Sequence, residues 1–162
     1  SNDKINSLIF SNATNNTYTV DAFFGKRLNR YEIGIPIVFD FIGLPIYDDF
    51  KKINNIQIIQ IGSGIDAEIH QRIGRSGKHT IFCGSNITLN YSQLKDLSAI
   101  KSHSIKTKAR FTLGLSLNNN NFNTRPFLAC VYTPYKRAIE YNNDTYDFTN
   151  WRIQLGVRIG IQ

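Results

Sequence analysis

The chain has 162 residues, a length that fits one domain with its own core, and its hydrophobic share of 41% excludes an intrinsically disordered chain. Its net charge of +7 raises nucleic acid as a partner, but the 19 Lys and Arg residues form small separate groups rather than one basic run. We therefore expect no nucleic-acid partner. No stretch approaches the roughly 18 consecutive apolar residues of a membrane-spanning helix.

The first regular segments alternate between apolar and polar residues. Residues 17–24 and 31–41 both do so, and in the second Tyr31, Ile33 and Ile35 fall at odd positions opposite Glu32 and Gly34. A period of two places all apolar side chains on one face of a strand, whereas a helix would scatter them. Both segments are predicted as strands.

The middle of the chain is predicted to hold three more strands, over residues 54–61, 65–72 and 78–88. Gly62, Ser63 and Gly64 have the composition of a tight hairpin turn and are predicted to join the first two. The alternation slips between Ile58 and Ile59, which predicts a β-bulge.

The last third repeats the alternation over residues 109–117 and 151–162, and in the final segment every odd position is apolar. Residues 125–135 are predicted as a further strand, because β-branched and aromatic residues dominate there, although the alternation is less regular. Longer connections are expected at 43–53, 89–104 and 137–149. The second is predicted to contain a short helix, because Tyr91, Leu94, Leu97 and Ile100 have near-helical spacing. The count is eight strands, with residues 1–14 left as a flexible or peripheral segment.

The polar faces of these strands carry glycines among charged residues, including Gly34, Gly114, Gly156 and Gly160. Glycine weakens a strand unless something crowds that face, and the interior of a narrow barrel does so. We therefore predict an all-β, antiparallel, up-and-down eight-stranded β-barrel. The alternative is a soluble antiparallel β-sandwich, in which the apolar faces would pack inward.

In the barrel, carboxylates on the earlier strands are expected to meet basic side chains on the later ones inside the lumen. The predicted lumen charge network comprises Glu32, Asp40, Asp66, Glu68, His70, Arg72, Arg110, Arg152 and Arg158. The residues predicted to face lipid are Ile33, Ile35, Leu113, Leu115, Leu155 and Val157.

The closing strand 151–161, the segment 127–135 before a loop, the size and the strand count resemble the small outer-membrane β-barrel proteins of Gram-negative bacteria. The resemblance covers most of the chain from about Thr17. It implies an exported outer-membrane protein, freed of its signal peptide, with a structural or adhesive role through long loops and no cofactor. The alternative is a secreted module that binds a glycan or a protein, or an assembly subunit.

Several basic residues are predicted to ring one extracellular rim: Lys26, Arg27, Arg30, Lys106, Lys136 and Arg137. Such a rim would lie at the level of the lipopolysaccharide phosphates and attract them. The expected partners are therefore membrane lipid or lipopolysaccharide, with other envelope proteins as a further candidate.

Residue types that carry chemistry are sparse. His103 lies between Ser102 and Ser104, but no nucleophile elbow accompanies them, and no HExxH or paired CxxC motif predicts a metal. Cys83 and Cys130 allow one disulfide or none. We expect no catalytic residue, no metal site and no enzymatic activity.

Overall fold

The computed structural model describes the backbone of residues 2–13, 17–48, 51–74, 78–96, 99–118, 122–133, 137–141, 144–148 and 151–161. It describes the side chains of residues 18–43, 57–74, 78–93, 104–118, 123–133 and 151–160. Among these residues no helix is long and apolar enough to cross a membrane.

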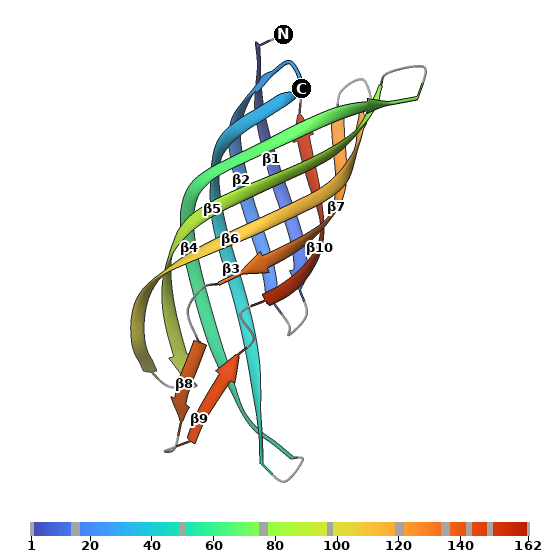
Figure 1. Cartoon of the computed structure of the whole chain (residues 1–162). Helices are drawn as coiled ribbons and strands as arrows, with labels where there is room; N and C mark the ends of the chain where they lie inside the picture. The colour runs from blue at the N-terminus through green and yellow to red at the C-terminus, as the bar shows by residue number, and fades with distance from the viewer. Residues whose placement is uncertain are drawn as a thin grey trace.

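Eight strands of the described chain close into an antiparallel barrel in the order β1-β10-β7-β6-β5-β4-β3-β2 (Figure 1). The barrel strands are β1 (Asn2–Ala13), β2 (Thr17–Leu28), β3 (Tyr31–Asp48), β4 (Lys51–Ile73), β5 (His79–Asp96), β6 (Ala99–Asn118), β7 (Phe122–Tyr132) and β10 (Trp151–Ile161). A separate two-stranded sheet pairs β8 (Arg137–Tyr141) with β9 (Asp144–Phe148). The predicted up-and-down barrel is confirmed.

The register fixes the width of the barrel. A row of paired residues that starts at Tyr18 passes through every strand and returns to β2 at Leu28, which is 28 − 18 = 10 residues further along. Eight strands with this stagger tilt by about 40° and enclose an interior that side chains can fill. Opposite walls are therefore close enough for their side chains to meet.

Strand length divides the barrel into two unequal parts. Strands β3 to β6 have 18, 23, 18 and 20 residues, whereas β1, β2, β7 and β10 have 11 or 12. The pairing of β2 with β3 ends at Thr17 and Ile42, and that of β7 with β6 ends at Tyr132 and Ala109. The longer strands continue past these points, away from the end with both termini (Figure 1). We call this four-stranded continuation the extension; residues 43–48 and 99–108 are its edges.

The structure differs from three expectations about the strands. Gly62 to Gly64 form no hairpin, because β4 runs through them with continuous pairing to β5. The predicted bulge at Ile58 is also absent: Ile58 is buried in the lumen, Ile59 lies on the outside, and the alternation is unbroken. The register between β3 and β4 shifts instead at Ile46 and Tyr47. The eighth barrel strand is β1, formed by residues 2–13, which the sequence left as a flexible or peripheral segment.

Two of the predicted long connections are strands as well. Residues 43–48 belong to β3, and β5 pairs with β6 as far as Asp96 and Ala99, so the predicted helix around Tyr91 is wrong. Pairing with a neighbouring strand satisfies the backbone groups that a helix would otherwise satisfy internally. The third connection, 137–149, contains the β8–β9 hairpin.

Burial is inverted relative to a soluble protein. Among the described side chains, 25 large apolar or aromatic residues are exposed and only eight hydrophobic residues are buried, while 22 polar or charged residues are buried. A soluble sandwich would bury the apolar faces between its sheets. The sandwich alternative is therefore wrong.

Candidate functional site

The first group of lumen side chains lies toward the end of the barrel that carries the termini. Glu32, which is 0% exposed, accepts hydrogen bonds from Arg27 Nη2 at 2.9 Å, Arg125 Nη1 at 2.9 Å and Arg158 Nη1 at 3.2 Å. Glu68 lies 2.7 Å from Arg158 Nη2 and 3.3 Å from Arg125 Nη1. Each buried carboxylate therefore faces two or three guanidinium groups, and we call this group the carboxylate cluster.

His70 completes the carboxylate cluster. Its Nε2 lies 3.2 Å from Glu68 Oε2 and 3.4 Å from Glu32 Oε2, and its ring stacks on Phe82 with centroids 5.4 Å apart. Ligand atoms of these two glutamates and His70 lie within 4.8 Å of one another, close enough to hold a metal ion.

Guanidinium groups already occupy the carboxylate oxygens of that set. The pairs made by Arg27, Arg125 and Arg158 satisfy the buried negative charge, and three positive charges beside the set would repel a metal cation. The arrangement fits a neutralising ion network better than a metal centre.

Two phenylalanine rings fill the space beside the cluster. Phe23 is fully buried. The guanidinium carbon of Arg158 lies over the Phe23 ring, 4.7 Å from the ring centroid. A Cβ at Gly25 or Gly34 would overlap the Phe23 ring, and one at Gly114 would overlap Phe82. The glycines of the polar face therefore make room for aromatic rings inside the lumen.

A second group of ion pairs crosses the middle of the lumen. Arg110 on β6 pairs with Asp21 on β2, and Lys108 on β6 pairs with Asp40 on β3. Asp66 lies 3.8 Å from Arg110 and 3.9 Å from Arg158, so it links this group to the carboxylate cluster. We call these contacts the mid-lumen pairs; they join strands that are not neighbours and so bridge opposite walls.

Most residues of the predicted network lie in the lumen. The buried ones are Glu32, Asp40, Asp66, Glu68, His70, Arg110, Arg152 and Arg158. The prediction for Arg72 is wrong: it is exposed, because β4 ends one residue later, at Ile73.

The sequence interpretation missed Asp21, Lys108 and Arg125 as lumen residues, and it assigned Arg27 to a rim. Asp21 had a signal, because it shares the polar phase of residues 17–24. Lys108 lies one residue before the predicted strand 109–117, so the underestimated length of β6 hid it.

The outer wall carries an apolar band. Ile33, Ile35, Leu113 and Leu115 are exposed, as is Leu155 at 66%, while Val157 is half-buried on the same face. Four aromatic residues of the outer wall, Tyr18, Tyr31, Tyr132 and Trp151, lie at the ends of their strands. The other exposed aromatic residues lie inside their strands: Phe24, Phe39, Phe41, Tyr91 and Phe111. Lys26, near the end of β2, is the only charged residue among the described outward positions of the paired strands.

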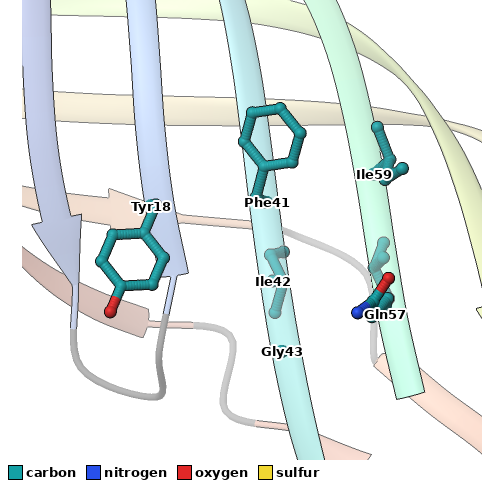
Figure 2. A pocket seen from close by; sticks show the side chains of 7 residues that line it. Tyr18, Phe41, Ile42, Gly43, Gln57 and Ile59 are labelled. Carbon is teal, nitrogen blue, oxygen red and sulfur yellow. The ribbon is translucent and has the colours of Figure 1, made fainter. Parts of the chain in front are cut away.

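A hollow of about 460 Å³ interrupts this outer wall (Figure 2). Tyr18, Phe41, Gln57 and Ile59 stand around it, and Ile42, Gly43 and Ile58 complete its lining (Figure 2). It lies at the start of β2, where its pairing with β3 stops and the extension begins. Its lining offers one hydroxyl and one amide as polar side-chain groups and no ionisable acid, base or thiol suited to catalysis.

No family model and no curated protein matches the sequence. Several solved structures match nearly the whole chain, including the following three. Neisserial surface protein A shares 12% identity at a TM-score of 0.58 and covers 98% of this chain and 93% of its own. The N-terminal β-barrel domain of Pseudomonas aeruginosa OprF shares 11% at 0.54, with 99% and 98% covered. A major outer membrane protein from Thermus thermophilus shares 9% at 0.56, with 98% and 99% covered.

This chain has the fold of the small outer-membrane β-barrel proteins. The resemblance inferred from the sequence pattern is confirmed at the level of the fold, which is as far as identities of 9 to 12% reach.

The barrel topology contradicts the predicted basic rim. Lys26, Arg27 and Arg30 lie at the end that carries the termini, whereas Lys106 lies in the extension, on one of its edges. Arg137 begins β8 with its side chain outside the described set, and Lys136 lies outside the described residues. The error came from the hairpin predicted at 62–64, because a turn that does not exist reverses the direction of every strand before it.

The two cysteines of the barrel are free. Cys83 pairs with Leu113 and Cys130 with Phe111, so one strand, β6, separates them. Two strand spacings amount to about 10 Å, beyond the Cα separation of a disulfide.

Residues 102–104, the predicted Ser-His-Ser loop, belong to β6, and the His103 side chain lies outside the described set.

Proposed function

We propose that this protein is a non-enzymatic outer-membrane barrel with a structural and surface-interaction role. The observation that carries the proposal is the apolar band: 25 large apolar side chains are exposed on the described chain, around a lumen of buried charges. Soluble monomers rarely expose contiguous apolar patches of more than a few hundred Å². Lipid is the solvent that makes such a surface favourable, and membrane lipid is therefore the first partner.

The lumen supports a closed barrel rather than a pore. Lys108–Asp40 and Arg110–Asp21 join opposite walls, and Arg125–Glu32 does the same nearer the termini. An ion that passed through would have to break these buried pairs, and separating one strands an uncompensated charge. We expect no steady conductance in a planar bilayer.

The fold neighbours support the location, and the lengths of the strands support the orientation. Two of them are described as a surface protein and a major outer membrane protein. Outer-membrane barrels have short turns on the periplasmic side and longer segments outside. In that orientation the termini and the two-residue turn at Asn29 and Arg30 face the periplasm, and the extension faces outward (Figure 1).

The extension is the candidate interaction surface. Within the described chain, residues 43–48 of β3 and 99–108 of β6 pair with a strand on one side only. An open sheet edge binds extended peptides by adding a strand. Ile105, on the β6 edge, is 74% exposed, so the edge also offers apolar area. A surface-exposed extended segment of another envelope or host protein is the partner that fits.

Vesicle insertion tests the proposed function. The chain, unfolded in urea, is diluted into phospholipid vesicles, which are then floated through a density gradient after a carbonate wash. We expect the folded barrel to float with the vesicles and to resist trypsin in the band. A folded chain that stays soluble and monomeric without lipid or detergent would overturn the proposal.

The role of the extension has its own test. Peptides selected by display on the inserted barrel should lose binding when Ser104→Pro disrupts the edge of β6. They should keep binding when Asn123→Pro is placed in β7, provided that variant still inserts. Equal binding to both variants would remove the edge as the interaction surface.

A further inference from the structure

The end of the barrel that carries both termini has a collar of basic side chains. Lys26, Arg30, Arg72 and Lys78 are all exposed there. Every Asp and Glu whose side chain is described is buried instead. The exposed charge at this end, within the described side chains, is therefore entirely positive.

Hydrogen bonds to the backbone carbonyls of two collar residues, Arg30 and Lys78, tie the collar to neighbouring strands. The backbone N–H of His70 donates to the carbonyl of Arg30 at 2.7 Å, which places the β2–β3 turn beside β4, two residues before Arg72. The side-chain amide of Asn118 donates to the carbonyl of Lys78 at 2.7 Å. The basic side chains therefore follow the wall from β2 to the β5–β6 pair rather than gathering at one point.

The collar borders the apolar band. Lys26 shares the outward face of β2 with exposed Phe24 and Leu28. Arg30 Nη2 donates to the hydroxyl of Tyr31 at 3.0 Å, and its guanidinium lies 5.2 Å from that ring, so an aromatic side chain of the band positions the cation. Aromatic rings and basic side chains at a hydrophobic boundary occupy the headgroup level of a bilayer.

We propose that this collar binds the phosphate groups of anionic lipids in the leaflet on the terminus side, which makes the protein selective for its lipid neighbours. The inference rests on the proposed membrane insertion. Each Lys or Arg near an anionic surface changes affinity on the order of fivefold, and salt weakens the effect. If the equivalent of one or two of the four residues is engaged at a time, the expected preference for phosphatidylglycerol over phosphatidylcholine is about tenfold.

The test measures lipid selectivity of the inserted barrel by electron paramagnetic resonance of spin-labelled lipids at low salt. The variant K26Q/R30Q/R72Q/K78Q should lose the preference, to within about twofold. The matched control K51Q/K52Q/K95Q/K101Q removes four charges from residues at the other end of the chain's long strands and should keep it. Millimolar orthophosphate should leave the preference unchanged, because the site recognises phosphate only where lipid presents it.

The outcomes separate this inference from the proposed function. An inserted wild-type barrel without any preference, or a control variant that loses it equally, overturns the collar alone. Displacement of the labelled lipid by orthophosphate assigns a free-phosphate site and also overturns it. A chain that never inserts, as judged by flotation, overturns the proposed function and the collar together.

Discussion

The lumen and the outer wall of the barrel are made by the same strands, and alternate residues of each strand supply them. The lumen contains the carboxylate cluster and the mid-lumen pairs, with Glu32 and Asp40 fully buried. On the outer wall, isoleucine, leucine and aromatic side chains are exposed across the band. A soluble barrel would reverse this distribution.

Two kinds of interaction hold these two regions in place. Lumen residues are specific, because each charge needs a partner at a particular position and distance. Outer residues are interchangeable with other apolar residues, because lipid makes no directional contact with them. Substitutions should therefore be costly in the lumen when they remove a partner, and costly outside only when they add a charge.

The largest effect is expected from Glu32→Gln. This change leaves Arg27, Arg125 and Arg158 without the carboxylate that all three contact. Breaking a buried pair costs about 3–5 kcal/mol, and the loss should appear as a lower free energy of unfolding in urea titrations of the inserted barrel. Glu140→Gln in β8, outside the barrel sheet, is the control and should stay within about 0.5 kcal/mol. A loss below about 1 kcal/mol for Glu32→Gln would mean that water screens the cluster.

The outer wall is tested by adding one arginine inside the band and one outside it. Leu155 lies near the middle of β10 and is expected near the bilayer midplane, where arginine costs about 2–4 kcal/mol. Ile105→Arg, in the extension, should change the free energy of unfolding by less than about 0.5 kcal/mol, although Ile105 is the more exposed residue. Equal costs at the two positions would contradict the placement of the band.

A double-mutant cycle measures the coupling within one of the mid-lumen pairs. Asp40→Asn and Lys108→Met each leave one buried charge without its partner, whereas the double variant leaves neither. We expect a favourable coupling energy of about 1–3 kcal/mol in the same unfolding assay. Additive losses would indicate that the two groups are separately solvated.

A smaller effect is expected where the lumen is crowded by an aromatic ring. Gly34→Ala places a methyl group against Phe23 and the backbone of β2, and overpacking of this kind costs about 1–3 kcal/mol. Adding Phe23→Leu should recover part of the loss, because the smaller side chain relieves the overlap. If Gly34→Ala is neutral, the ring does not need the glycine.

The alternation of residues was enough to predict the barrel and the direction of most side chains. Along 31–41 and 151–161 the period of two assigned Glu32, Asp40 and Arg158 to one face and Ile33 and Leu155 to the other. That assignment depends only on local backbone geometry, which is the same in every strand. The length of each strand and the strands it pairs with depend on residues far away in sequence. The local alternation carries no information about them.

The hairpin predicted at residues 62–64 shows why the local pattern misjudged strand length. Gly62 and Gly64 have the composition of a turn, but in β4 a Cβ at Gly62 would overlap the side chain of Asn90, and one at Gly64 would overlap the backbone of Ile87. The glycines serve close packing against β5, and only the pairing with β5 distinguishes that role from a turn. Because this one error reversed the earlier strands, it also placed Lys26, Arg27 and Arg30 at the wrong end.

Spin-label accessibility along β10 distinguishes a lipid-facing outer wall from a soluble surface. Single cysteines are introduced from Arg152 to Gly160 in the vesicle-inserted barrel, in a background in which Cys83 and Cys130 are replaced by serine. We expect labels at 153, 155, 157 and 159 to collide with oxygen from the lipid phase and labels at 152, 154, 158 and 160 not to do so. Equal accessibility at odd and even positions, or odd positions that collide mainly with a water-soluble nickel complex, would contradict a lipid-facing outer wall.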